Sequence, residues 1–198
     1  FSQVLFTSNP FSDIGRSTSD FLRQLGNGMD RMLRACEVQS SKGAEAALSQ
    51  LSDAQSALAA LRAAVAEAQV SKRWSLRGRL HAERINIVTQ RYDRHAIRVY
   101  ATSLLLAESI SRAMSHTHTP PPAAVMTYCQ WLSDNCMELA RQSTVFVLKE
   151  SAPQAYMGKQ PQSTIYKCDI LPPEWLIVED NAKQLEYALQ VLLCSRDA

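Results

Sequence analysis

The sequence predicts an all-α protein, an antiparallel bundle of about five long helices with one irregular, proline-containing loop. Three observations support this prediction. Apolar residues recur at spacings of three and four through most of the chain, as they do on a helix with one buried face. The 198 residues include only 6 glycines and 8 prolines, so long stretches contain no helix breaker. The composition, 46% hydrophobic and 20% charged, allows a substantial core and excludes disordered, collagen-like and disulfide-rich classes.

A single helical domain is expected over residues 1–198. Its predicted parts are an irregular lead-in over 1–16, core helices over 17–150, an ordered loop over 151–179 and a C-terminal helix over 180–196. The first helix is expected to begin at Ser17–Asp20, where a hydroxyl is followed three residues later by a carboxylate. Its apolar stripe then runs from Phe21 to Cys36.

The next two helices are predicted from longer stripes. Apolar positions between Ala47 and Ala68 alternate four and three, and the many alanines favour a helix over Ala44–Val70. From about Ser75 to His116 the same rhythm continues without proline, which predicts a helix longer than the usual length of about 8–20 residues. Such a length indicates a long bundle or a coiled-coil arm.

Prolines mark the ends of the remaining elements. Pro120–Pro122 is expected to close the third helix and to open a fourth, since proline is favoured in a first helical turn. Four prolines and Gly158 make Ser151–Glu179 irregular or extended, with a short strand predicted at Ile165–Leu171. Asp180 is the predicted cap of the final helix.

The cysteines and the apolar runs indicate the cellular setting. Five scattered cysteines match neither a disulfide framework nor a zinc motif, so buried free thiols in a reducing, cytoplasmic compartment are expected. No apolar run reaches the roughly 18 residues that a membrane-spanning helix needs. Because the chain starts with Phe1 rather than Met, it is expected to be part of a longer protein, which leaves room for a membrane anchor elsewhere.

The net charge of +2 hides a strongly uneven distribution. Residues 71–98 hold eight basic residues and two acids, a net charge of +6, so the rest of the chain carries −4. Four of the arginines are seven residues apart and therefore follow one slowly drifting helix face. The candidate residues for binding an anionic ligand or lipid are Arg77, Arg84, Arg91, Arg94 and Arg98.

Two interpretations of this arginine stripe stay open. In the first, it is a solvated face or pairs with acids such as Glu45, Asp53 and Glu67 on a neighbouring helix, since arginine suits bidentate pairing. In the second, it binds an anionic partner: lipid head groups, nucleic acid or a carboxylate ligand. An anionic membrane leaflet fits better than nucleic acid, because no DNA- or RNA-binding motif accompanies the stripe. No nucleic-acid partner is therefore predicted.

Motifs that carry catalytic chemistry are scarce. The chain has no glycine-rich phosphate loop, no nucleophile elbow and no pair of acids arranged for general acid–base catalysis. His116 and His118 lack a nearby acid or cysteine and are expected at the surface rather than on a metal. His81 and His95 are expected to be neutral among so many cations. The sequence therefore predicts no enzyme activity, no cofactor and no metal site.

One part of the chain resembles a known family. The alanine-rich run Ala60–Ala68, the connector Arg73–Arg79, then Arg84, and the segment Tyr92–Val99 resemble the cytosolic helical region of the fusaric acid resistance and aromatic acid exporter superfamily. In that family an alanine-rich helix leads through an aromatic and basic connector into a second helix. The resemblance covers about a third of the chain. The acid Asp93 stands one position out of the family pattern, and Val99 stands where an Asn is common.

The resemblance implies a cytosolic domain attached to membrane helices outside this sequence, on the cytoplasmic face of the inner membrane. The family implies efflux of small aromatic or other organic acids, with a soluble domain that serves assembly or regulation. The expected partners are the protein's own transmembrane region, anionic lipid or a small organic acid, and a second copy of the chain. Two alternatives stay open: a stand-alone helical interaction module, and a sensor that holds an organic anion among Tyr92, Arg91, Arg94 and Arg98.

Overall fold

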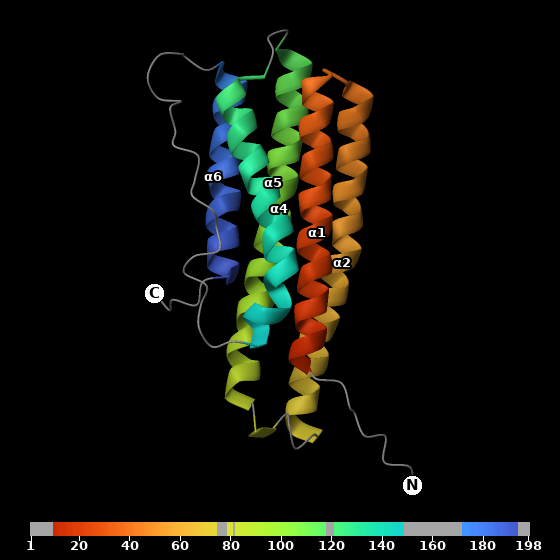
Figure 1. Cartoon of the computed structure of the whole chain (residues 1–198), viewed down its shortest axis with the longest axis vertical. Coiled ribbons are helices and arrows are strands. Elements are labelled where there is room, and N and C mark those ends of the chain that lie inside the picture. Colours follow the sequence, from red (N-terminus) through yellow and green to blue (C-terminus); the bar gives the residue numbers. More distant parts are fainter. Residues whose placement is uncertain (1–9, 75–78, 81, 118–120, 149–171, 194–198) are drawn as a thin grey trace.

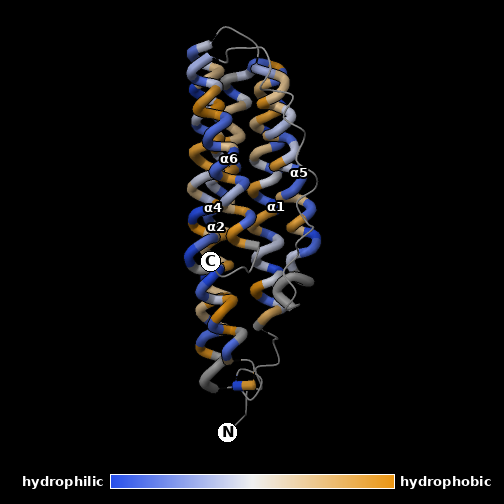
Figure 2. The backbone as a smooth tube through the Cα atoms, turned by 90° about the vertical axis from the view of Figure 1, so that its left-hand side faces the viewer, coloured by the Kyte–Doolittle hydropathy of each residue, from blue (hydrophilic) through white to orange (hydrophobic). Residues whose placement is uncertain are grey.

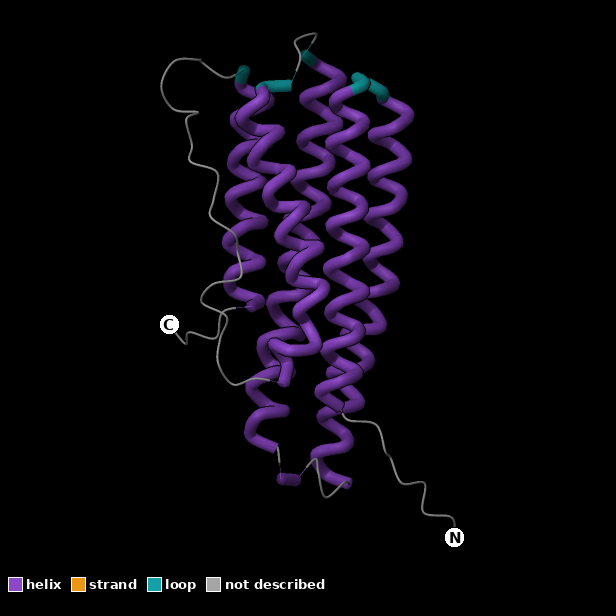
Figure 3. Tube along the Cα trace, viewed as in Figure 1, coloured by secondary structure: helices purple, strands orange, loops and turns teal. Residues whose placement is uncertain are grey.

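The computed structural model describes residues 10–74, 79–80, 82–117, 121–148 and 172–193. These residues form long helices and no strand (Figure 3). The helices are α1 (Pro10–Glu37), α2 (Ser41–Trp74), α4 (Ala82–His116), α5 (Ala123–Leu148) and α6 (Pro173–Leu193). The prediction of an all-α helical bundle is confirmed. The strand predicted at Ile165–Leu171 lies outside the described residues.

The helices stand side by side along one axis (Figure 1). Going around the bundle, α5 packs on α1, α1 on α2, α2 on α4, and α4 on α6, while α5 and α6 touch over a smaller region. Each of the four larger pairs is antiparallel, and α5 and α6 run in the same direction. The α2–α4 pair extends past the ends of the other helices. Buried apolar residues occur along each of these helices, and hydrophobic and hydrophilic residues are interspersed along the tube in Figure 2.

The first helix begins earlier than the sequence motif suggests. The irregular lead-in expected over residues 1–16 is helical from Pro10 onward, because proline suits a first turn, where its missing amide hydrogen costs nothing. Phe11 and Ile14 are buried and extend the stripe of the helix in the N-terminal direction. The predicted start at Ser17–Asp20 is mid-helix, and the Thr18 hydroxyl donates to the Ile14 carbonyl at 2.7 Å. Residues 1–9 lie outside the described residues.

The last helix also begins at a proline. The loop expected over 151–179 is helical from Pro173, and Trp175 and Leu176 donate backbone hydrogen bonds to the Pro172 carbonyl at 2.9 and 3.2 Å. The predicted cap, Asp180, lies two turns inside this helix. Trp175 is fully buried, so the first turn is held by packing as well as by its proline. Residues 149–171 and 194–198 are outside the description.

Small residues let α1 pack closely on both neighbours. A Cβ atom at Gly28 would lie 2.6 Å from Cδ2 of Leu51 on α2, and one at Gly26 would lie 2.9 Å from Sδ of Met137 on α5. The two glycines therefore serve helix packing rather than helix interruption. Three buried serine hydroxyls also donate across the α1–α5 interface to main-chain carbonyls: Ser19 to Ala140 (2.6 Å), Ser133 to Gly26 (3.0 Å) and Ser143 to Gly15 (3.0 Å). These bonds fix the register of the antiparallel pair.

Candidate functional site

The three described arginines of the predicted set, Arg91, Arg94 and Arg98, lie on the side of α4 that faces away from the core. Arg94 and Arg98 are exposed and Arg91 is half-buried. Arg77 lies outside the described residues, and so does the side chain of Arg84. The structure therefore brings three of the five predicted residues together, over two successive turns of one helix.

A histidine lies within about one helical turn of all three arginines along the chain. Burial lowers the pKa of His95 below its ordinary value of 6.5, and the charges of Arg98, Arg91 and Arg94 lower it further. The expectation that His95 is neutral at neutral pH agrees with this direction.

Arg98 also has a packing role. Its guanidinium carbon lies 5.1 Å from the centre of the Tyr187 ring on α6, a cation–π contact between the two helices. Farther along the helix, Arg112 pairs with Glu108 on α4 itself, with an Nη2–Oε1 distance of 3.4 Å. Arg98 thus has a structural contact on a neighbouring helix, but with an aromatic ring rather than with an acid as the first interpretation expects.

The described arginines do not form the ion pairs with acids of α2 that the first interpretation suggests. Glu45, Asp53 and Glu67 are all exposed on α2. Within the described ranges, none of the three pairs with Arg91, Arg94 or Arg98. The positive charge of this part of α4 is therefore not neutralised by those acids.

The arginines share their face with exposed apolar side chains, which the charge pattern of the sequence does not indicate. Ile87 is 52% exposed and Leu105 is 48% exposed, and Leu80, which precedes the helix, is 73% exposed. A signal was present in the sequence, since Ile87, Arg91, Arg94 and Arg98 follow one another at spacings of four, three and four, and Leu80 and Leu105 lie seven residues before and after them. We call Ile87, Arg91, Arg94, Arg98 and Leu105 the α4 outer face. By helix geometry it spans about 27 Å.

Tyr92 does not belong to this face. It is 4% exposed and hydrogen-bonds the Thr18 side chain of α1, and its burial raises the pKa of the phenol. The sensor alternative that groups Tyr92 with the arginines is therefore not supported by its position, because the ring is in the core between α4 and α1.

The cysteines described by the structure are buried free thiols, as expected. Burial raises the pKa of Cys36, Cys129 and Cys136 to about 12 in each case. Thiols in this state are poor nucleophiles at neutral pH. Cys168 and Cys194 lie outside the described residues, as does His118, while His116 is exposed at the end of α4.

Comparison with known proteins gives no relative for this chain: no protein-family model, no curated protein and no solved structure matches it. The resemblance to the exporter superfamily therefore stays a prediction. Among the described residues, no helix is both long enough and apolar enough to cross a bilayer. The same residues contain no group of three His, Cys, Asp or Glu side chains placed to hold a metal ion.

Proposed function

We propose that this chain is a membrane-apposed helical domain that rests the α4 outer face on an anionic lipid surface. The observation that carries the proposal is that two exposed apolar side chains, Ile87 and Leu105, flank three arginines along one face of a single helix. Arginine heads can reach the phosphate layer while Ile87 and Leu105 enter the boundary of the acyl chains. A helix that lies in the membrane interface has this pattern.

The expected strength of this contact is modest. A basic residue close to an anionic surface contributes about 1 kcal/mol, so the three described arginines contribute about 3 kcal/mol. The apolar side chains add less than their full transfer energy, because each is already about half-covered by the protein. Binding of this size is reversible and needs a second attachment to the membrane.

The resemblance to the exporter superfamily supplies such an attachment. We extend the proposal accordingly: the chain serves assembly or regulation of an inner-membrane transporter of small organic acids, with its membrane helices outside this sequence. The α4 outer face then keeps the domain against the cytoplasmic leaflet.

A second copy of the chain fits the α4 outer face less well than lipid does. Pairing this face with itself would bring two sets of arginines together, and like charges in contact oppose association. The stand-alone interaction module stays a second candidate only through surfaces other than this one.

Vesicle flotation tests the proposal. The protein is expected to float with phosphatidylcholine–phosphatidylglycerol vesicles, to stay behind with phosphatidylcholine alone, and to be released by salt. The double substitution Arg91→Gln and Arg94→Gln removes about 2 kcal/mol and should weaken binding by about 30-fold. Glutamine has nearly the helix propensity of arginine, so the fold should be unaffected.

The matched control makes the same change of net charge on another helix. Arg16 and Arg31 are exposed on α1, and Arg16→Gln with Arg31→Gln should leave vesicle binding within about twofold of the wild type. Equal losses in the two double variants would mean that only overall charge matters and would reject the α4 outer face. Binding to neutral vesicles that equals binding to anionic ones would reject the lipid proposal altogether.

A further inference from the structure

A small cavity lies between α1, α4 and α5, near the end of the bundle where α1 and α4 finish and α5 begins. Its volume is about 10 Å³, close to the smallest space that holds one water molecule, so a single ion fits it and a larger ligand does not. Three of its lining side chains carry sulfur: Met29 and Met32 from α1, and Cys129 from α5. The others are leucine, isoleucine and alanine, and every lining residue is at most 4% exposed.

The register of the helices places the three sulfur-bearing residues at one level. In the antiparallel register set by the three serine hydrogen bonds between α1 and α5, Cys129 lies level with Asp30, and therefore between Met29 and Met32 along the axis. Met29 and Met32 are three residues apart on α1 and so share a face of that helix. The cavity is thus bounded by two thioether side chains from one helix and by one thiol from its neighbour.

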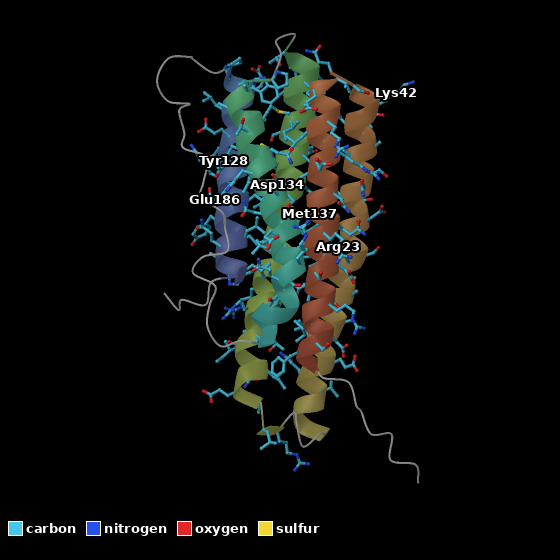
Figure 4. All side chains as sticks on the ribbon, in the orientation of Figure 1. Arg23, Lys42, Tyr128, Asp134, Met137 and Glu186 are labelled. Atoms are coloured by element: carbon cyan, nitrogen blue, oxygen red, sulfur yellow. The ribbon has the colours of Figure 1, made fainter. Side chains whose placement is uncertain are left out.

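The thiol of Cys129 is held in the cavity wall. It is 1% exposed, and within the described part of the chain it makes no hydrogen bond. The preceding residue, Tyr128, donates from its hydroxyl to the Glu186 carboxylate on α6, and Figure 4 labels these two side chains where α5 and α6 meet. This bond opposes any rotation of α5 that would take Cys129 out of the wall. A buried thiol without a hydrogen-bond partner therefore faces the cavity.

A second pair of sulfur atoms lies between the cavity and the end of the bundle. The Cys36 thiol donates to Sδ of Met114 at 3.1 Å, a contact between α1 and α4. Both residues are in the last turns of their helices. Cys36 is four residues beyond Met32, and so about 6 Å farther along the axis of α1. Soft sulfur ligands thus continue from the cavity toward the end of the bundle.

The ligands and their surroundings favour a soft ion with a single positive charge. Thiolate and thioether sulfur are preferred by Cu(I), whereas magnesium and calcium prefer oxygen ligands. Cu(I) bound to one thiolate has no net charge, so the pair can lie among apolar side chains without the cost of burying an ion. Zn²⁺ bound to the same thiolate would leave one positive charge buried, and it usually takes four ligands from Cys, His and carboxylate groups.

We propose that this cavity binds one Cu(I) ion through the Cys129 thiolate and the thioethers of Met29 and Met32. The Cys129 proton passes to solvent as the sulfur–copper bond forms, and the copper stays in the +1 state. The two methionine side chains can close on the ion because each has three rotatable bonds. Sequence spacing gives no sign of this site, because its ligands come together only through the register of α1 and α5. The proposal is independent of the lipid surface proposed above, since the cavity shares no residue with the α4 outer face.

NMR of isotope-labelled methionine methyl groups, recorded without oxygen, tests the proposal. The signals of Met29 and Met32 are assigned with the variants Met29→Leu and Met32→Leu. Cu(I), supplied as its acetonitrile complex, should change both signals until the site is saturated. The signal of Met137, which lies farther along α5 in Figure 4, should not change. Zn²⁺ should leave the Met29 and Met32 signals unchanged.

Cysteine variants test the thiolate ligand. Cys129→Ala removes it and should abolish the changes at Met29 and Met32. The matched control is Cys136→Ala, because Cys136 is a second buried free thiol on α5, and this variant should keep the changes.

Methionine variants test the thioether ligands in a protein that keeps the thiol. Met29→Leu with Met32→Leu nearly conserves side-chain volume, so the fold should be kept. With bicinchoninate as a buffer of free Cu(I), the backbone amide signal of Cys129 should then respond only at a concentration at least about tenfold higher, since even outer-shell partners of a metal are worth about 10–100-fold. Met126→Leu with Met137→Leu, which removes two other thioethers, should respond as the wild type does.

Four results would overturn the proposal. They are unchanged Met29 and Met32 signals when Cu(I) is added to the wild type, equal results for Cys129→Ala and Cys136→Ala, a wild-type response from the variant that lacks both Met29 and Met32, and the same signal changes with Zn²⁺ as with Cu(I).

Discussion

Gly28 offers a direct test of how tightly α1 and α2 pack, through the substitution Gly28→Ala. In an uncrowded helix interior this change stabilises by about 1 kcal/mol, because glycine has the greater backbone freedom to lose. Here the new Cβ would lie 2.6 Å from Cδ2 and 2.7 Å from Cγ of Leu51, whereas carbon atoms in contact prefer about 3.5–4.0 Å. The overlap is therefore close to 1 Å at two atoms.

Leu51 has little room to relieve that overlap. Its side chain is 0% exposed, and Cγ sits close to the backbone rather than at the far end of the chain. Overpacking of this kind costs about 1–3 kcal/mol, so Gly28→Ala should be neutral to destabilising by about 2 kcal/mol. In a Leu51→Ala background the overlap is gone, and Gly28→Ala should stabilise by about 1 kcal/mol. The prediction is thus that the effect of Gly28→Ala differs by about 1–3 kcal/mol between the two backgrounds and is stabilising only in Leu51→Ala.

Urea unfolding followed by far-ultraviolet circular dichroism measures the four proteins of this double-mutant cycle. Gly26→Ala is the internal comparison, because the atoms it meets at 2.9 Å are Cγ and Sδ of Met137, a flexible and half-buried side chain that can move. Its effect should stay within about 0.5 kcal/mol of zero, as the gain in helix propensity offsets the shift of Met137. A gain of about 1 kcal/mol from Gly28→Ala in both backgrounds would refute the reasoning, because it would mean that Leu51 moves without cost.

Two further predictions concern titrating groups. Burial raises the pKa of Cys136 from 9.0 to about 12, so between these pH values the folded state keeps a proton that the unfolded state has lost. The free energy of unfolding therefore falls as the pH rises above 9, by up to about 1.4 kcal/mol per pH unit. Cys136→Ala should reduce this slope by the same amount when urea unfolding is measured as a function of pH. Equal slopes in the two proteins would contradict the burial of this thiol. The pKa of His95 should lie below 6.5 in an NMR titration of the wild type. It should rise toward 6.5 in Arg94→Gln, because one of the positive charges that lower it is removed. A pKa at or above 6.5 in the wild type would show that the three arginines do not act on the imidazole. Below pH 6.5 the unfolded state binds a proton at His95 that the folded state does not bind. His95 therefore lowers the free energy of unfolding as the pH falls below 6.5.

The helices could be predicted where the signal is periodic. In the second helix all seven positions of the predicted stripe, from Ala47 to Ala68, are buried in the structure. The starts of α1 and α6 could not, because Pro10 and Pro173 are equally consistent with a loop and with a first helical turn. The choice between them depends on whether Phe11 and Trp175 find a core to pack in, which is a tertiary property.

The candidate sites divide in the same way. The arginines of the α4 outer face could be predicted, because a spacing of seven on one helix needs no knowledge of its neighbours. The cation–π contact of Arg98 could not, because Tyr187 is 89 positions away on α6 and becomes a neighbour only when the two helices pair.

The α4 outer face also determines how the domain would lie beside a membrane. In Figure 2 α4 runs along one side of the molecule and α5 along the other. Beside an anionic surface the arginines of α4 are attracted, whereas an exposed acid on α5 such as Asp134 is repelled. The favourable orientation therefore places α4 against the lipid and turns α5 toward solvent.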